Sequence, residues 1–233
     1  IYPGLIEPYF QVATAPSEEE ETPPGRHQLI KPDARINAAH WPQDQIESMR
    51  RAGFTTAVMA PDHGLIRGSG VVANLGDGGL SNNVIDPSFG QFMSFDGRAG
   101  RREFPSSLMG AVALVRQTLS DAQWQNQARN AWALDPAQPR PQWFEGLDEL
   151  ATTINGGTPM VFESQDLLDT LRIQEFISSN EIRLAIVGHG QEYQRLDAIA
   201  SGEELHIIPL NFPPAPDVKD ENDLNVSLES LRH

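Results

Sequence analysis

The sequence contains no cysteine, few aromatic residues and too few basic residues to balance its acidic ones. With no cysteine, disulfide bonds, thiolate metal ligands and a cysteine nucleophile are all excluded. The sequence has 17 Lys and Arg residues and 32 Asp and Glu residues, which gives a formal net charge of −15. Such a surface repels phosphate backbones and anionic lipid headgroups, so we do not expect nucleic acid as a partner.

Long hydrophobic runs are also missing. No stretch approaches the roughly 20 apolar residues that a membrane-spanning helix requires, so no membrane span is expected. These absences leave the compartment open, because both a cytoplasmic and an exported or periplasmic location are compatible with them. What is present, 233 residues of which 39% are hydrophobic, suits one α/β domain, since a barrel of that class takes roughly 250 residues.

Strand and helix signals alternate along the chain and predict βα units with a parallel sheet. The expected strands are 1–6, 55–60, 89–95, 159–162, 183–187 and 206–210, and the expected helices are 42–52, 106–133, 143–154, 166–178 and 192–200. An acidic segment at 17–24 predicts a solvated loop. Strands that are apolar throughout require a sheet covered on both faces, and such sheets place functional residues at the C-terminal ends of their strands.

Two histidines stand where a strand is expected to end. His63 follows the strand at 55–60, and His189 lies between two glycines after the strand at 183–187. Such an imidazole can reach a ligand or a metal ion, and the alternative is a histidine that hydrogen-bonds the loop backbone. The six histidines form no HxH, HExxH or HxxxH pair, so the sequence contains no local metal-binding motif of these kinds.

Two charged residues complete the candidates that the residues alone suggest. Glu163 ends an expected strand and is the best-placed carboxylate for acid–base work or metal coordination; the alternative is that it caps a helix or pairs with an arginine. Arg67 lies in the glycine-rich segment 64–70 and could hold an anionic substrate group. Tight turns explain these glycines as well, because the segment matches neither GxxxxGK[ST] nor GxGxxG.

Five stretches together resemble the amidohydrolase superfamily, in particular imidazolonepropionase-like bacterial proteins. They are YPGLIEPYFQ, RRAGFTTAVMAPDHGLIRGSG, FPSSLMGAVALVRQTLSDAQW, TPMVFESQDLLDTLRIQEF and LAIVGHGQEYQRLDAI. The resemblance implies a TIM-type (β/α)8 barrel beside a small β-sandwich. It also implies hydrolysis of amide or cyclic amide C–N bonds by a metal-activated water.

The first strand of that family typically reads PGLID-x-H-x-H, and both histidines bind metal. In this sequence Glu7 stands at the aspartate position, and Tyr9 and Gln11 stand at the two histidine positions. Neither is an ordinary zinc ligand. The resemblance therefore makes Tyr9 and Gln11, together with His63 and Arg67, candidates for substrate binding.

The other ligand positions of the family are changed as well. Phe162 or Glu163 stands at the fifth-strand histidine position, and His189 matches the sixth-strand histidine. Glu163 and His189 are thus the catalytic candidates, and His189 is the one candidate metal ligand. A catalytic zinc ion is usually held by about three protein ligands. Two alternatives therefore stay open: the chain binds one divalent, zinc-like ion, or it binds no metal. The lost ligands favour the second alternative.

The resemblance assigns about seven βα units of the barrel to residues 1–212, without the sandwich, and a proline-rich acidic connection to 213–233. Such an incomplete barrel has unpaired edges, so we expect an oligomer, or completion by the rest of a longer polypeptide or a partner chain. Two functions stay open. One is an amidohydrolase-like hydrolase with a lost or atypical metal site, and the other is a non-catalytic barrel that serves as a binding or scaffold module.

Overall fold

The computed structural model describes residues 3–14, 26–96, 104–144, 146–177, 182–190, 192–199 and 204–207. The strands are β1 (Leu5–Val12), β2 (Phe54–Pro61), β3 (Ile66–Ser69), β4 (Val71–Asn74), β5 (Val84–Asp86), β6 (Gln91–Ser94), β7 (Met160–Glu163), β8 (Leu184–Val187) and β9 (Leu205–Ile207). The helices are α1 (Gln43–Ala52), α2 (Leu80–Asn83), α3 (Leu108–Leu134), α4 (Leu147–Ile154), α5 (Leu167–Ile177) and α6 (Leu196–Ile199), with 3-10 turns η1 (Ala38–His40) and η2 (Glu192–Arg195).

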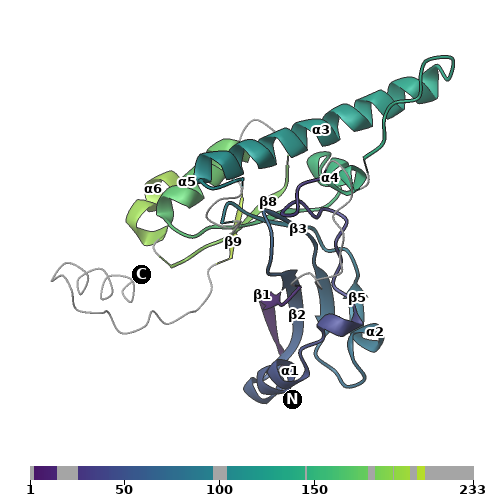
Figure 1. Ribbon diagram of the computed structural model, residues 1–233. Helices are drawn as coiled ribbons and strands as arrows, with labels where there is room; N and C mark the ends of the chain where they lie inside the picture. Colours follow the sequence, from purple (N-terminus) through teal and green to yellow (C-terminus); the bar gives the residue numbers. More distant parts are fainter. Residues whose placement is uncertain are drawn as a thin grey trace.

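These elements form a mixed α/β fold with two sheets. The smaller sheet has the strand order β1-β2-β4-β5, and the larger sheet has the order β3-β6-β7-β8-β9. In Figure 1, helices α3, α4, α5 and α6 lie around the larger sheet, whereas α1 and α2 accompany the smaller one. The expected acidic loop at 17–24 and the expected connection at 213–233 lie outside the described residues.

Several elements lie where the sequence predicts them. The expected strands at 159–162 and 183–187 correspond to β7 and β8, and the expected helices at 42–52, 106–133 and 166–178 correspond to α1, α3 and α5. Helix α4 begins only at Leu147, because Gly146 before it has a left-handed backbone conformation with φ of +86°. The segment predicted as one helix at 192–200 divides into η2 and the short α6.

The strand directions differ from the single parallel sheet that the sequence predicts. Parallel pairing joins β1 to β2 and connects β6, β7, β8 and β9 in series. Strands β3, β4 and β5 are antiparallel to their neighbours. Strands β2 and β4 are neighbours, and segment 62–70 between them, which contains β3, is shorter than the crossover of about a dozen residues that parallel neighbours need. The described residues therefore do not form a complete (β/α)8 barrel.

The prediction of a buried strand at 1–6 is wrong. The strand is Leu5–Val12, and the Leu5 and Ile6 side chains are 54% and 65% exposed. Among the described residues β1 lies at the edge of its sheet, with β2 as its neighbour. Its buried residue is Val12, which packs with residues of β2, β4 and α1.

Both sheets contribute to a shared interior, which we call the inner core. Its buried members are Val58, Ala60, Phe92, Val161, Ala185 and Val187. The neighbouring strand residues Phe162 and Ile186 point the other way and pack with α3, α4 and α5. Successive residues of these strands therefore alternate between an interior lined by strands and an outer layer of helices.

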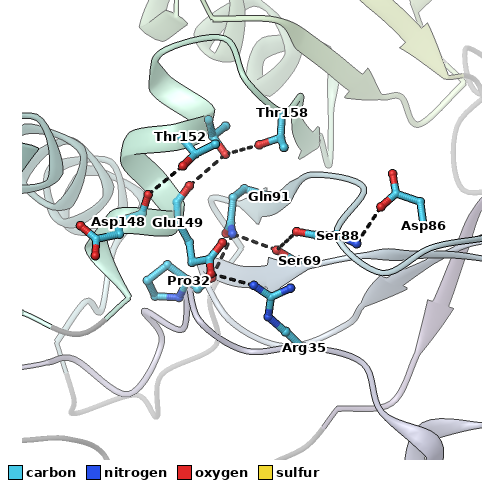
Figure 2. Close-up of polar contacts among 11 residues, drawn as sticks. Pro32, Arg35, Ser69, Asp86, Ser88, Gln91, Asp148, Glu149, Thr152 and Thr158 are labelled. Atoms are coloured by element: carbon cyan, nitrogen blue, oxygen red, sulfur yellow. Dashed lines mark hydrogen bonds and ion pairs between the residues drawn. The ribbon is translucent and has the colours of Figure 1, made fainter. Parts of the chain in front are cut away.

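A polar network ties the segment before α1 to the N-terminal end of β6 (Figure 2). Gln91 is 2% exposed, and its Nε2 donates to the Pro32 carbonyl oxygen at 2.9 Å and to Ser69 Oγ at 3.2 Å. Arg35 donates to the Glu149 carboxylate of α4 at 2.7 Å. Since the N-terminal strand ends of β/α folds serve stability, we assign this network to folding.

Helix α3 has 27 residues, and its C-terminal half projects beyond the larger sheet (Figure 1). The chain returns along this half, where the Arg129 guanidinium lies 4.5 Å from the Trp143 ring centroid and Gln125 Oε1 accepts from the Phe144 N–H. Among the described residues, no helix combines the length and apolar character needed to cross a membrane.

Gly68 and Gly53 offer a matched test of the packing beside β3, because both have φ of +98°. A Cβ on Gly68 would lie 2.3 Å from the Ala34 carbonyl oxygen, whereas a Cβ on Gly53 would meet nothing within 4 Å. We expect Gly53→Ala to lower the free energy of unfolding by about 1 kcal/mol, for the left-handed backbone alone. Gly68→Ala should cost about 2 kcal/mol more, because the backbone must shift. Urea denaturation measures both, and equal losses would contradict this explanation.

Candidate functional site

Four of the residues singled out in the sequence meet at the strand ends: Tyr9, Gln11, Arg67 and Glu163, here called the strand-end cluster. Arg67 Nη1 lies 2.5 Å from Glu163 Oε2 and 3.3 Å from the Tyr9 hydroxyl oxygen, to which it donates. Gln11 Nε2 donates to the Tyr9 hydroxyl at 2.9 Å and to Glu163 Oε2 at 3.2 Å. The cluster thus joins β1, β3 and β7.

The path of β1 brings Tyr9 and Gln11 to the same face. They are two residues apart in a strand, so their side chains point in the same direction. Between Glu7 and Phe10, β1 has one more residue than the opposing part of β2, and Pro8 lies in this bulge. A proline suits a bulge because it has no N–H to donate to the ladder. The Glu7 carboxylate accepts the Tyr9 N–H at 3.1 Å and so holds the bulge.

A second bulge orients Arg67. In the register of β3 against β6, Ile66 pairs with Met93 and Gly68 pairs with Phe92, which leaves Arg67 as the extra residue. Ile66 packs in the outer layer, whereas the Arg67 side chain reaches Tyr9 and Glu163 and is 5% exposed. The glycine-rich segment around it therefore forms a bulged strand.

The charges of the cluster compensate one another. The Arg67 and Glu163 side chains are 5% and 20% exposed, and Glu163 Oε2 accepts from both Arg67 and Gln11. Burial raises the pKa of the Tyr9 phenol well above its ordinary value; the Arg67 charge opposes this and the Glu163 charge adds to it. Tyr9 is therefore a neutral hydrogen-bonding group at physiological pH.

His189 lies apart from these contacts. It follows β8, where Val187 pairs in register with Glu163, and within the described residues no hydrogen bond joins it to the strand-end cluster. Its Nδ1 is 3.2 Å from Glu192 Oε1. The buried Glu192 carboxylate also accepts the N–H groups of His189 at 2.7 Å and Gly190 at 2.8 Å.

Glu192 is a contact of His189 that the sequence analysis does not identify. The signal available for it is the glycine that precedes His189, because a Cβ on Gly188 would lie 2.1 Å from Glu192 Oε1. A side chain at residue 188 would therefore displace the Glu192 carboxylate from this position. The sequence alone does not reveal this contact, because it depends on the conformation of the loop after β8.

His63 and Phe162 take no part in the cluster. His63 is half-buried beyond β2 and makes no hydrogen bond or ion pair within the described ranges. Its substrate-binding role stays a prediction. Phe162 is buried in the outer layer, so Glu163 is the residue of the two that the strand turns toward Tyr9 and Gln11.

The side chains of the described residues do not provide the ligand set of a divalent ion. The described part of the chain has no group of three or more His, Cys, Asp or Glu side chains that could hold a metal ion. The strand-end cluster offers one carboxylate, a neutral phenol and an amide, and a cation there would also meet the charge of Arg67. His189 faces a separate carboxylate, Glu192.

Comparison with known proteins identifies the fold but no sequence family. No family model matches the chain, and no curated protein matches its sequence. The crystal structure of an amidohydrolase from Thermotoga maritima MSB8 is similar, with a TM-score of 0.71 at 12% sequence identity. The similarity covers 98% of this chain and 63% of that chain, so this chain spans less than two thirds of that protein's length. The fold is therefore amidohydrolase-like.

The Arg67–Glu163 pair can be tested by a double-mutant cycle. Arg67→Met or Glu163→Met alone leaves one buried charge without its partner, and each should lower the free energy of unfolding by about 3 kcal/mol. The double variant should lose less than the sum of the two, because no unpaired charge remains. Urea denaturation measures the coupling. The exposed pair Glu47–Arg51, with atoms 3.7 Å apart, is the control and should show a coupling below about 0.5 kcal/mol. Additive losses at Arg67 and Glu163 would contradict a coupled pair.

The raised pKa of Tyr9 predicts a loss of stability at high pH. The pKa of Tyr9 is higher in the folded state than in the unfolded state, where it is about 10. The stability that the neutral Tyr9 phenol contributes is therefore complete below about pH 10 and is lost as pH rises above it. We expect the wild-type free energy of unfolding to fall more between pH 8 and pH 11 than that of Tyr9→Phe. Tyr193→Phe is the control and should follow the wild type. A parallel decline of wild type and Tyr9→Phe would show that Tyr9 is not the group responsible.

Proposed function

We propose that the chain is a metal-free, amidohydrolase-like barrel portion that serves as a binding or scaffold module and does not itself hydrolyse C–N bonds. The supporting observation is the Arg67–Glu163 ion pair, whose atoms lie 2.5 Å apart at the end of β7. Folds of this class keep their chemistry at that end of the strands. Here the position holds a buried, internally compensated salt bridge.

The state of each cluster member argues against a general base there. A general base must be free to accept a proton from a substrate or a water. Glu163 Oε2 already accepts from Arg67 and Gln11, and the raised pKa keeps Tyr9 protonated. The cluster therefore suits cohesion of the strand ends or recognition of a polar ligand better than proton transfer.

A specific observation favours a second candidate, a hydrolase of amide or cyclic amide bonds. His189 Nδ1 lies 3.2 Å from an oxygen of the buried Glu192 carboxylate, and both ring nitrogens are buried without a hydrogen-bond partner among the described residues, so a nitrogen is available to act as a general base. In this version His189 accepts the proton of an attacking water. The amidohydrolase name of the similar Thermotoga maritima structure agrees with this class of reaction.

The rest of a longer polypeptide, or a partner chain, is proposed to complete the barrel wall. Within the described residues, β1 and β9 each have a strand neighbour on one side. Strand edges of this kind offer unpaired N–H and C=O groups that bind another strand. Assembly of this module into a larger or oligomeric protein is therefore part of the proposal.

Metal binding and turnover distinguish the two candidates. For the binding or scaffold module, we expect less than one equivalent of zinc or manganese after reconstitution, and no rise in the thermal midpoint when either ion is added. We also expect no hydrolysis of a panel of linear and cyclic amides. Metal analysis, differential scanning calorimetry and product detection measure these outcomes.

The matched control is His40→Gln, which removes a histidine outside the strand ends. Turnover that is lost in His189→Ala and kept in His40→Gln would overturn the proposal in favour of the hydrolase. One equivalent of bound metal that is lost in Glu163→Gln or His189→Ala, and kept in His40→Gln, would overturn the metal-free assignment.

A further inference from the structure

A pocket lies on the helix-covered side of the larger sheet, opposite the inner core. It has a volume of about 450 Å³ and lies between α3 and α5, which run close together over the sheet (Figure 1). Val112 and Arg116 of α3 form one wall, and Leu171, Arg172 and Phe176 of α5 form the other. The volume is in the range of sites for small organic molecules, roughly 300–1,000 Å³.

Aromatic side chains make the floor of the pocket apolar and well packed. Phe95, directly after β6, is 4% exposed and lines the pocket. Its ring centroid lies 4.6 Å from that of Phe162 and 5.6 Å from that of Phe176, which it meets edge-on. Because Phe162 is fully buried against the helices, the floor is anchored in the core and offers a preformed apolar surface.

Two cationic side chains stand at the rim. The Arg116 guanidinium carbon lies 5.4 Å from the Phe176 ring centroid, and Arg172 is one helical turn before Phe176. Neither forms an ion pair or hydrogen bond with another of the described residues. Two acidic groups are near: Glu175 also lines the pocket, and the Arg172 charge opposes the rise that burial causes in the pKa of Asp169.

We propose that this pocket binds a small organic anion with an apolar body, such as an aromatic carboxylate or sulfonate. The apolar body packs on Phe95, Leu171 and Phe176, where contact with the rings removes its surface from water. The anionic group lies between Arg116 and Arg172, since guanidinium groups donate paired hydrogen bonds to such oxygens. The proposal is independent of the strand-end cluster, which lies on the other side of the sheet.

A fluorescent probe with these two features tests the proposal. 8-Anilinonaphthalene-1-sulfonate carries a sulfonate on an aromatic body, and N-phenyl-1-naphthylamine has a similar body without the charge. We expect the sulfonate to bind the native protein with 1:1 stoichiometry. Its Kd should rise at least about tenfold in Arg116→Met/Arg172→Met, because both charge-assisted contacts are lost. The neutral probe should bind the wild type more weakly than the sulfonate does. Its affinity should be the same for the wild type and for Arg116→Met/Arg172→Met.

The control variant is Arg51→Met/Arg195→Met, which removes the same charge from exposed positions elsewhere. It should bind the sulfonate like the wild type. Near-UV circular dichroism of each variant establishes that the native packing is intact. The proposal is overturned if the sulfonate does not bind, if Arg116→Met/Arg172→Met binds it with unchanged affinity, or if the control variant loses affinity to the same extent.

Discussion

The interior of this protein depends on the buried ion pair of Arg67 and Glu163. The pair connects β3, an antiparallel strand, to β7 in the parallel series, and through Gln11 and Tyr9 it reaches β1 in the other sheet. Removal of two charges from water costs several kcal/mol for each ion, so the pair is favourable only where its geometry and hydrogen bonds are well made. Two bulges, at Pro8 and at Arg67, provide that geometry.

The same pair limits the chemistry of the strand ends. An amidohydrolase-like fold places its functional groups there, yet a function must be argued from the groups that are present and not from the fold. Here the carboxylate is compensated by a guanidinium, the phenol stays neutral, and the histidine of the neighbouring strand end faces its own carboxylate, Glu192. On the outer side, Arg116 and Arg172 stand above an aromatic floor, and within the described residues neither forms an ion pair or hydrogen bond.

Much of the local structure could be predicted from the sequence. The glycine that ends α1 and the continuous apolar runs of β7 and β8 are patterns within a few residues. The strand directions around β3 to β5 could not be predicted in this way, and neither could the exposure of Leu5 and Ile6. Both depend on which strands become neighbours, a property of the whole sheet.

By itself, the sequence determined that the chain has no cysteine and an excess of acidic residues, and it predicted alternating strands and helices and singled out Tyr9 and Gln11 through a family resemblance. Only the tertiary structure decided that Glu163 pairs with Arg67 and contacts Gln11, 152 residues away, while His63 and His189 lie outside that network. The physical reason is the distance along the sequence over which each kind of interaction acts. Periodicity and turn residues act over a few positions, whereas these contacts follow from strand order, register and two bulges that shift a side chain from one face to the other.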